Sequence, residues 1–247
     1  NNVSVRYSNS TGTTTKTETK SEESSKGGEV AEVTGDIPTK DQVNAMSSKQ
    51  IVENIKVGWN LGNSLDSHDT NSSDTETGWG NPKTTQQMID TVKAAGFNAV
   101  RIPVTWGEHM AADGTIDAAW MSRVKEVVDY AYNDGLYVIL NVHHDDELWL
   151  VPTKDKLESD KATLTTIWKQ ICATFQDYDH RLIFEGMNET RVIGSAEEWT
   201  GGTQESYDVI NQLFQAFVDT VRASGGSNTD RTVIVTDYAQ SAEKNAI

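Results

Sequence analysis

The sequence predicts an α/β protein built on a parallel sheet. Short apolar segments suited to buried strands alternate along the chain with amphipathic segments suited to helices. The strand segments are apolar almost throughout, which indicates a sheet covered on both faces. Polar residues follow each apolar run at the point where the strand is expected to stop. We therefore expect a layered fold that gathers polar groups at one edge of its sheet.

Five strand–helix units can be followed in order from the apolar periodicity. In the helix segments, apolar residues recur at three- and four-residue steps, as in Leu164, Ile167, Trp168 and Ile171. We expect strands within 55–63, 98–104, 136–145, 182–189 and 232–238, and helices over 47–55, 84–95, 117–133, 161–175 and 207–223.

Two architectures fit this alternation, a doubly wound sheet and a (β/α)8 TIM barrel. No Gly-x-Gly-x-x-Gly motif follows the first strand, and no phosphate-binding loop is present, which weakens the dinucleotide-binding alternative. Convergence of polar residues at the carboxyl ends of strands is typical of barrel enzymes. These residues are Asn60 and Asn63, Arg101, His143 to Asp145, Asn188 and Glu189, and Asp237 and Tyr238.

The strand spacing predicts an incomplete barrel. The strands begin near positions 57, 99, 137, 182 and 232, so eight such units would need roughly 350 residues. Only 191 residues run from Val57 to Ile247. We expect about five of the eight β/α units in this chain.

Residues 1–35 are predicted to form a disordered linker. They are mostly Ser, Thr, Lys, Glu and Gly, and such a segment cannot bury enough apolar area to offset the entropy lost on ordering. It is of the kind that tethers exported bacterial enzymes to an anchor or another module. We expect the globular part to occupy 36–247.

Composition limits the function classes. The chain has 37 acidic and 21 basic residues, a formal net charge of −16, which argues against nucleic acid and anionic membranes as partners. No apolar run reaches the length of a membrane span. The single cysteine, Cys172, lies among apolar residues and is expected to be a core thiol.

The segment 182–189, Leu-Ile-Phe-Glu-Gly-Met-Asn-Glu, carries the main catalytic candidate. A buried strand holds a carboxylate rigidly at the mouth of an α/β fold, so we predict that Glu189 is a general acid/base. A helix-capping or surface glutamate is the alternative. Glu185 lies about 13 Å deeper along a strand and is expected to pair with a base such as Arg101. Asp145 and Asp146 are the other nearby carboxyl groups.

Two adjacent histidines follow the third strand. His143 and His144 are expected to point to opposite faces of the strand, so we do not expect them to share a metal ion. The chain also lacks a His-Glu-x-x-His or His-x-His pattern. Hydrogen bonding to a hydroxyl-rich substrate is the favoured interpretation, with zinc as the alternative.

Several tryptophans lie at or just past strand ends. Aromatic rings in a cleft suit the flat C–H faces of sugars, and we predict this role for the tryptophans at 59, 79, 106 and 149. Trp120 and Trp168 lie on helix stripes and are assigned to the core.

Five ordered motifs together resemble glycoside hydrolase family 5, the cellulase family, and most closely its endoglucanase and xyloglucanase branch. They cover about residues 36 to 247 and lie at 58–66 (GWNLGNSLD), 79–82 (WGNP), 98–104 (NAVRIPV), 140–145 (LNVHHD) and 182–189.

The resemblance implies a retaining (β/α)8 endo-β-1,4-glucanase that needs no metal or other cofactor. It implies that Glu189 is the acid/base, that Asn188 binds the sugar 2-hydroxyl, and that Arg101 and His143 are the arginine after strand two and the histidine after strand three. Asn63, His144, Trp149 and Tyr238 are the expected substrate contacts.

Two departures from the family pattern stand out. Thr190 replaces the usual proline, which is expected to loosen the turn after Glu189. The nucleophilic glutamate of the family lies on strands six to eight, and no residue of this chain corresponds to it. We therefore expect little or no activity from this chain alone.

The expected partner is a β-glucan polysaccharide such as cellulose, mixed-linkage glucan or xyloglucan. The expected location is extracellular or at the surface of a bacterial cell. A non-catalytic glycan-binding fragment and a mannanase or xyloglucanase of the same family remain as alternatives.

Overall fold

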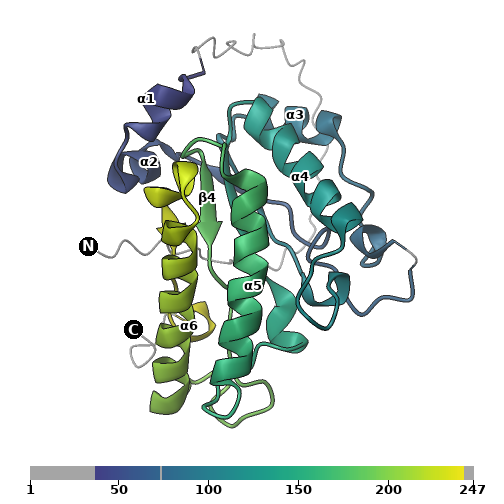
Figure 1. The fold of residues 1–247 in the computed structure, drawn as a ribbon. Coiled ribbons are helices and arrows are strands. Elements are labelled where there is room, and N and C mark those ends of the chain that lie inside the picture. The colour runs from purple at the N-terminus through teal and green to yellow at the C-terminus, as the bar shows by residue number, and fades with distance from the viewer. Residues whose placement is uncertain (1–36, 73, 242–247) are drawn as a thin grey trace, which may run out of the picture.

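A computed structural model describes residues 37–72 and 74–241 (Figure 1). Its sheet has five strands in the order β1-β2-β3-β4-β5, and every neighbouring pair is parallel. The strands are β1 (Gly58–Asn60), β2 (Ala99–Ile102), β3 (Tyr137–Asn141), β4 (Leu182–Glu185) and β5 (Val233–Ile234). This sheet confirms the predicted α/β class.

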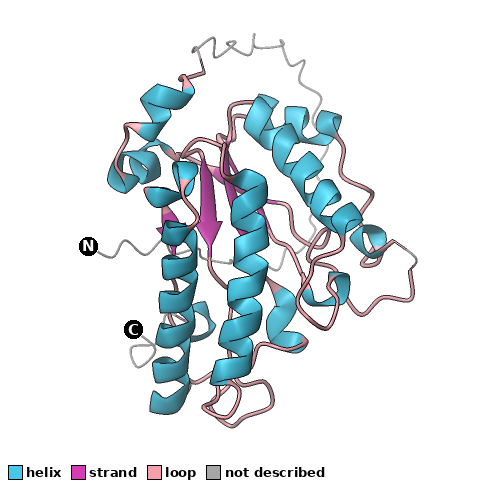
Figure 2. Ribbon diagram, in the orientation of Figure 1, coloured by secondary structure: helices cyan, strands magenta, loops and turns pink. Residues whose placement is uncertain are grey.

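Helices connect the strands and cover one face of the sheet, as Figure 2 shows. The α-helices are α1 (Lys40–Asn44), α2 (Ser48–Asn54), α3 (Gln86–Ala94), α4 (Ala118–Asn133), α5 (Leu157–Phe175) and α6 (Gln204–Ala223). Short 3-10 turns are η1 (Thr75–Thr77), η2 (Gly107–His109), η3 (His144–Glu147), η4 (Gly226–Thr229) and η5 (Tyr238–Gln240). Helices α5 and α6 pack side by side (Figure 1).

Alternation along the strands divides their side chains between two cores. Val100, Val138 and Phe184 belong to the larger core, which also contains the buried faces of α3 to α6. Ala99, Tyr137, Ile139 and Ile183 belong to a second cluster, together with Val43 of α1 and Ile51 of α2. Helices α1 and α2 therefore pack against the end of the sheet at which the strands begin.

The same alternation places three polar residues on the side of the sheet that carries the second cluster. Arg101 lies two residues after Ala99, Asn141 two after Ile139, and Glu185 two after Ile183. Asn141 and Glu185 are register partners across β3 and β4. A polar layer at the carboxyl end of the sheet thus follows directly from strand register.

Several boundaries differ from those expected, and β3 and β5 also end earlier, at Asn141 and Ile234. Strand β4 ends at Glu185 instead of reaching Glu189, because the segment beyond it keeps one bond to each neighbouring segment, from Gly186 N–H to the Ile234 carbonyl and from Asn188 N–H to the Val142 carbonyl. Helix α6 begins at Gln204, earlier than predicted, because Thr203 and Ser206 form a capping box. Helix α5 likewise begins early, at Leu157.

The predicted linker over 1–35 lies outside the described residues. Among the residues that are described, no helix combines the length and the apolar character needed to cross a membrane.

Candidate active site

Arg101 organises the carboxyl end of the sheet. Its Nε donates to Glu185 Oε2 at 2.7 Å and its Nη2 donates to Glu185 Oε1 at 2.6 Å, a bidentate pair. The same Nη2 donates to Asn188 Oδ1 at 2.8 Å, and Nη1 donates to Asn60 Oδ1 at 3.1 Å. The predicted pairing of Glu185 with Arg101 is confirmed, and it fixes the orientation of the Asn188 amide.

Glu185 is a structural acid surrounded by donors. It is 3% exposed, and its Oε1 also accepts hydrogen bonds from Asn141 Nδ2 at 3.3 Å and Gln240 Nε2 at 3.0 Å. Gln240 was not predicted as a partner of Glu185. It lies in η5, past the end of β5, and has a positive φ of 48° that no sequence pattern indicates. These contacts leave Glu185 poorly placed to act as a nucleophile.

Glu189 lies four residues beyond Glu185, in the loop that follows β4. Asn188 N–H donates to the Val142 carbonyl at 2.8 Å, which anchors this loop to the segment after β3. The Glu189 side chain is half-buried, and within 37–72 and 74–241 its carboxylate accepts no hydrogen bond. It is therefore a rigidly carried carboxylate whose oxygens remain available.

Thr190 tightens the turn where a loosened one was expected. Its N–H donates to the Asn188 carbonyl at 2.7 Å, a bond that proline could not make. Its carbonyl accepts from Ala239 N–H at 3.2 Å. The next residue, Arg191, donates to the Glu189 carbonyl at 3.2 Å. Threonine at this position thus holds the Glu189 loop by backbone bonds.

The two aspartates after β3 both have structural partners. Asp145 accepts from Trp106 N–H at 3.0 Å, Gly107 N–H at 2.7 Å and Trp149 Nε1 at 2.7 Å. Burial raises its pKa to about 6 in spite of these donors. Asp146 pairs with Arg191, and burial raises its pKa to about 7 against the pull of that guanidinium. Neither is a free second carboxylate.

His143 and His144 do not diverge as predicted. Their rings lie edge to face with centroids 4.4 Å apart. Their Nε2 atoms lie 4.0 and 3.9 Å from the same oxygen, Asp66 Oδ2. The expectation of opposite faces was wrong because β3 ends at Asn141, and the backbone turns at His143 (φ −106°, ψ −85°) into η3. Strand alternation no longer applies there.

The His143 ring is held neutral. Burial, followed by the charge of Arg101, lowers its pKa well below the usual 6.5. Its Nδ1 lies 3.1 Å from Asn141 Nδ2. Because that amide nitrogen can only donate, Nδ1 accepts, and the proton of the neutral ring is on Nε2. His143 therefore presents an N–H donor toward the side of Asp66.

The four tryptophans predicted for the cleft differ in how far they are exposed in the structure. Trp106 is fully buried and donates from Nε1 to the Asn141 carbonyl at 2.9 Å, so its cleft assignment was wrong. Trp149 is half-buried and held by Asp145. Trp79 is 39% exposed, and Trp59 is half-buried against the core. The core assignment of the tryptophans at 120 and 168 is confirmed, since both are buried.

Trp79 lies in a loop that a buried ion pair anchors. Its Nε1 donates to the His68 carbonyl at 3.1 Å. The loop it belongs to contains Glu76, which is 1% exposed and receives two 2.8 Å bonds from Arg123 of α4. Burial alone would raise the pKa of Glu76, but the bonds from Arg123 and Thr84 N–H outweigh it and lower the pKa.

The remaining predicted contacts differ in exposure. Asn63 is exposed in the loop after β1 and has a left-handed φ of 59°, which asparagine tolerates. Tyr238 is not brought to the open surface. It is 2% exposed, and its hydroxyl oxygen accepts from Val192 N–H at 3.2 Å, so it braces the loop that carries Glu189.

Trp199 is an aromatic residue that the sequence analysis missed. It is 61% exposed in the loop between Glu189 and α6, and the Arg191 guanidinium stacks 4.6 Å from its ring centroid. With Tyr238 it lines a small cavity of about 110 Å³. The other tryptophans were chosen because they lie at or just past predicted strand ends, and Trp199 does not.

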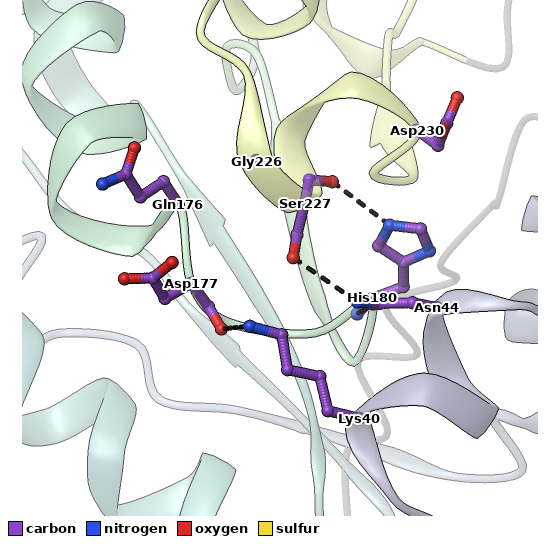
Figure 3. A pocket seen from close by; sticks show the side chains of 8 residues that line it. All are labelled: Lys40, Asn44, Gln176, Asp177, His180, Gly226, Ser227 and Asp230. Atoms are coloured by element: carbon purple, nitrogen blue, oxygen red, sulfur yellow. Dashed lines mark hydrogen bonds between the residues drawn. The ribbon is translucent and has the colours of Figure 1, made fainter.

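A larger cavity, of about 340 Å³, lies at the opposite end of the sheet (Figure 3). Lys40 and Asn44 of α1 face His180, which precedes β4, and Ser227, which precedes β5. Asn44 Oδ1 accepts from His180 N–H at 3.1 Å, and His180 Nε2 donates to the Ser227 carbonyl at 3.1 Å. This cavity lies between α1 and the amino end of the sheet, far from Glu189 at the carboxyl end.

Comparison with known proteins identifies relatives of this chain among the cellulases. Residues 64–247 match Cellulase, glycosyl hydrolase family 5. Endoglucanase A of Ruminococcus albus is 47% identical over 214 residues, which cover 86% of this chain and 58% of that enzyme. Endoglucanase A of Clostridium longisporum is 48% identical over 207 residues, which cover 81% of this chain and 40% of that enzyme.

Solved structures of the family superpose on the described fold. A xyloglucan-specific endo-β-1,4-glucanase from a metagenomic library, in complex with cellotriose, has a TM-score of 0.78 at 48% identity and covers 84% of this chain and 61% of its own. A broad-specificity endoglucanase of Ruminococcus champanellensis with bound cellotriose has a TM-score of 0.78 at 47% identity and covers 82% and 60%.

The chain thus spans about three-fifths or less of the relatives it matches. The five parallel strands agree with the corresponding part of the (β/α)8 barrel of these neighbours, as the strand spacing predicted. On the family match and on these identities, the chain belongs to glycosyl hydrolase family 5, the cellulases.

Proposed function

We propose that this chain carries the acid/base part of a retaining endo-β-1,4-glucanase, with Glu189 as the general acid/base. The observation that carries the proposal is the contrast among the carboxylates at this end of the sheet. Glu185, Asp145 and Asp146 are all engaged by arginine or N–H donors. Glu189 is rigidly carried, yet within the described residues it accepts no hydrogen bond.

The chemistry assigns a distinct task to each neighbour of Glu189. In retention, an acid protonates the leaving oxygen and then, as a base, activates the water that cleaves the glycosyl-enzyme intermediate. Asn188, clamped by Arg101, would direct its amide toward a sugar hydroxyl. His143, neutral and protonated on Nε2, would offer a second donor. Asn63, Trp79, His144 and Trp149 would supply further sugar contacts.

Retention also requires a nucleophilic carboxylate about 5–5.5 Å from the acid. The engaged state of Glu185, Asp145 and Asp146 supports the inference that no described carboxylate serves as nucleophile. We accordingly propose little or no turnover by the 247-residue chain alone. The substrate class proposed is β-1,4-glucan, cellulosic or xyloglucan, because two related enzymes were solved with cellotriose and one of them is xyloglucan-specific. Because a β-glucan is a large polymer, we also propose that the reaction takes place outside a bacterial cell or at its surface.

A hybrid enzyme tests the assignment of Glu189. Residues 37–247 would be joined to the part of the Ruminococcus albus endoglucanase that lies beyond the matched region. Glu189→Gln should then lower kcat on soluble β-glucan by about 10²–10⁴-fold. An aryl cellobioside with a good leaving group needs no proton in the first step, so its initial burst of phenol should survive. A merely structural role would suppress both reactions equally.

The matched control is Glu197→Gln, an exposed glutamate of the same loop, which should leave both reactions unchanged. Polymer turnover that persists in the Glu189→Gln hybrid would refute the proposal.

A non-catalytic glycan-binding role is the second candidate, because the donors proposed for sugar hydroxyls, Asn188 and His143, would bind a glycan without a nucleophile. Saturable binding of soluble glucan to the 247-residue chain, without release of reducing ends, would support it only if the hybrid were also inactive.

A further inference from the structure

Three of the five histidines of the chain gather beside the predicted cleft. The ring centroid of His144 lies 5.2 Å from that of His68 and 4.4 Å from that of His143. Trp79 closes the group from one side, with its ring 5.1 Å from His68 and 5.4 Å from His144. Two carboxylates, Asp66 and Glu147, face these imidazoles.

We propose that His68, His144 and Glu147 form a binding site for a divalent transition-metal ion such as Zn²⁺. The three ligand atoms would be His68 Nε2, His144 Nδ1 and a carboxylate oxygen of Glu147. Two histidines and a glutamate are a donor set that zinc accepts, with one position left for water or another ligand.

The distances within this triad suit such an ion. Zinc bonds of about 2.0–2.1 Å in a tetrahedron separate neighbouring ligand atoms by about 3.4 Å. His144 Nδ1 lies 3.4 Å from Glu147 Oε1, and His68 Nε2 lies 3.7 Å from Glu147 Oε2. One ligand atom from each residue can be chosen so that all lie within 4.8 Å of one another. Small rotations of side chains would complete the geometry.

His68 gives an independent reason to place an ion here. The residue is only 6% exposed, yet neither ring nitrogen makes a hydrogen bond with any described residue, and Nδ1 is fully enclosed. A buried imidazole nitrogen that makes no hydrogen bond is costly. A metal ion on Nε2 would offset part of that cost, and it could enter from solvent past Glu147, whose side chain is 39% exposed.

A second triad, Asp66, His143 and His144, is a weaker match. Its nitrogen–oxygen distances are 4.0 and 3.9 Å, longer than those of the first triad. Its Asp66 also accepts from Ser64 N–H at 2.8 Å. His144 would have to use Nε2 here and Nδ1 in the first triad, so one neutral imidazole serves one site at a time. The two triads can therefore be told apart by substitution.

The test is titration of the 247-residue chain with CoCl2 and ZnCl2, without any glycan. We expect cobalt to give the intense visible bands of low coordination, zinc to abolish them, and calorimetry to show a single zinc site. Loss of one ligand, in Glu147→Gln or His144→Gln, should weaken zinc binding by more than about 100-fold, since even indirect supports of metal ligands contribute 10–100-fold.

Two control variants define the outcome. Asp66→Asn should leave zinc affinity nearly unchanged, as should Glu158→Gln, an exposed glutamate on α5. Circular dichroism would confirm that each variant is folded. Absence of zinc binding by the unsubstituted chain would overturn the proposal. So would loss of binding in Asp66→Asn together with full binding in Glu147→Gln, because that pattern assigns the ion to the other triad.

Discussion

Each end of the sheet has an arginine with several hydrogen bonds, and the two arginines have different kinds of partner. At the amino end, Arg231 is fully buried, and its guanidinium donates to four backbone carbonyls and to Asn228 Oδ1. At the carboxyl end, Arg101 donates to the side chains of Glu185, Asn188 and Asn60. Arg231 therefore holds backbone segments in place, whereas Arg101 orients side chains.

The difference separates a structural charge from a functional one. The carbonyls around Arg231 belong to residues 175–182, the turn that leads into β4, so the arginine closes that turn. Arg101 holds Glu185 and the Asn188 amide beside Glu189, whose carboxylate makes no bond within the described chain. A buried network that leaves one carboxylate available is suited to catalysis, whereas a fully closed network stabilises the fold.

The largest effect on stability is expected from Arg231→Met. The substitution strips donors from buried carbonyls, so we expect a loss of about 3–5 kcal/mol in the free energy of unfolding, measured by urea titration. Arg222→Met, which removes a single bond to the Asn228 carbonyl, should cost about 1 kcal/mol. Equal losses in the two variants would contradict the closing role assigned to Arg231.

Glu185→Gln should have an intermediate effect at the other end of the sheet. It replaces the carboxylate that pairs with the Arg101 guanidinium by a neutral amide, and we expect the free energy of unfolding to fall by about 1.5–3 kcal/mol. Cellotriose binding should weaken too, because Arg101 also orients Asn188. The control Glu126→Gln breaks a surface pair with Arg123 and should change stability by less than about 1 kcal/mol.

Acid sensitivity should distinguish the two ends. Burial lowers the pKa of His143 well below 6.5 and also lowers that of His180. A lowered pKa means that the unfolded chain binds more protons, so stability is complete above pH 6.5 and falls as the pH drops below it, by up to about 1.4 kcal/mol per pH unit for each histidine. His143→Gln should remove this dependence over a wider pH range than His180→Gln, since the pKa of His143 is lowered further. Equal pH ranges in the two variants, measured by urea titration at several pH values, would show that the ends do not differ.

The smallest effect on stability is expected from Glu189→Gln. Because the carboxylate has no partner among the described residues, the free energy of unfolding should change by no more than about 0.5 kcal/mol. A loss above about 1.5 kcal/mol, the net value of a hydrogen bond, would reveal a structural partner and undermine the contrast between the two ends.

Much of the fold could be predicted because periodicity is local. The alternation of strands and helices, the pairing of Glu185 with Arg101 and the core positions of Trp120 and Trp168 all followed from spacing along the chain. Prediction failed where regular structure stopped. Trp106 and the two histidines after β3 lie in turns, and in a turn the direction of a side chain depends on contacts with distant segments.

The sequence by itself determined the order of the strands and therefore which polar groups lie toward the carboxyl end of the sheet. Tertiary structure alone decided how those groups share partners. It supplied Gln240 to Glu185, buried Tyr238, placed Trp199 in the open and turned His143 and His144 toward Asp66. The physical reason is that strand register follows from local backbone geometry, whereas the partner of a buried polar group is set by whichever distant segment packs against it.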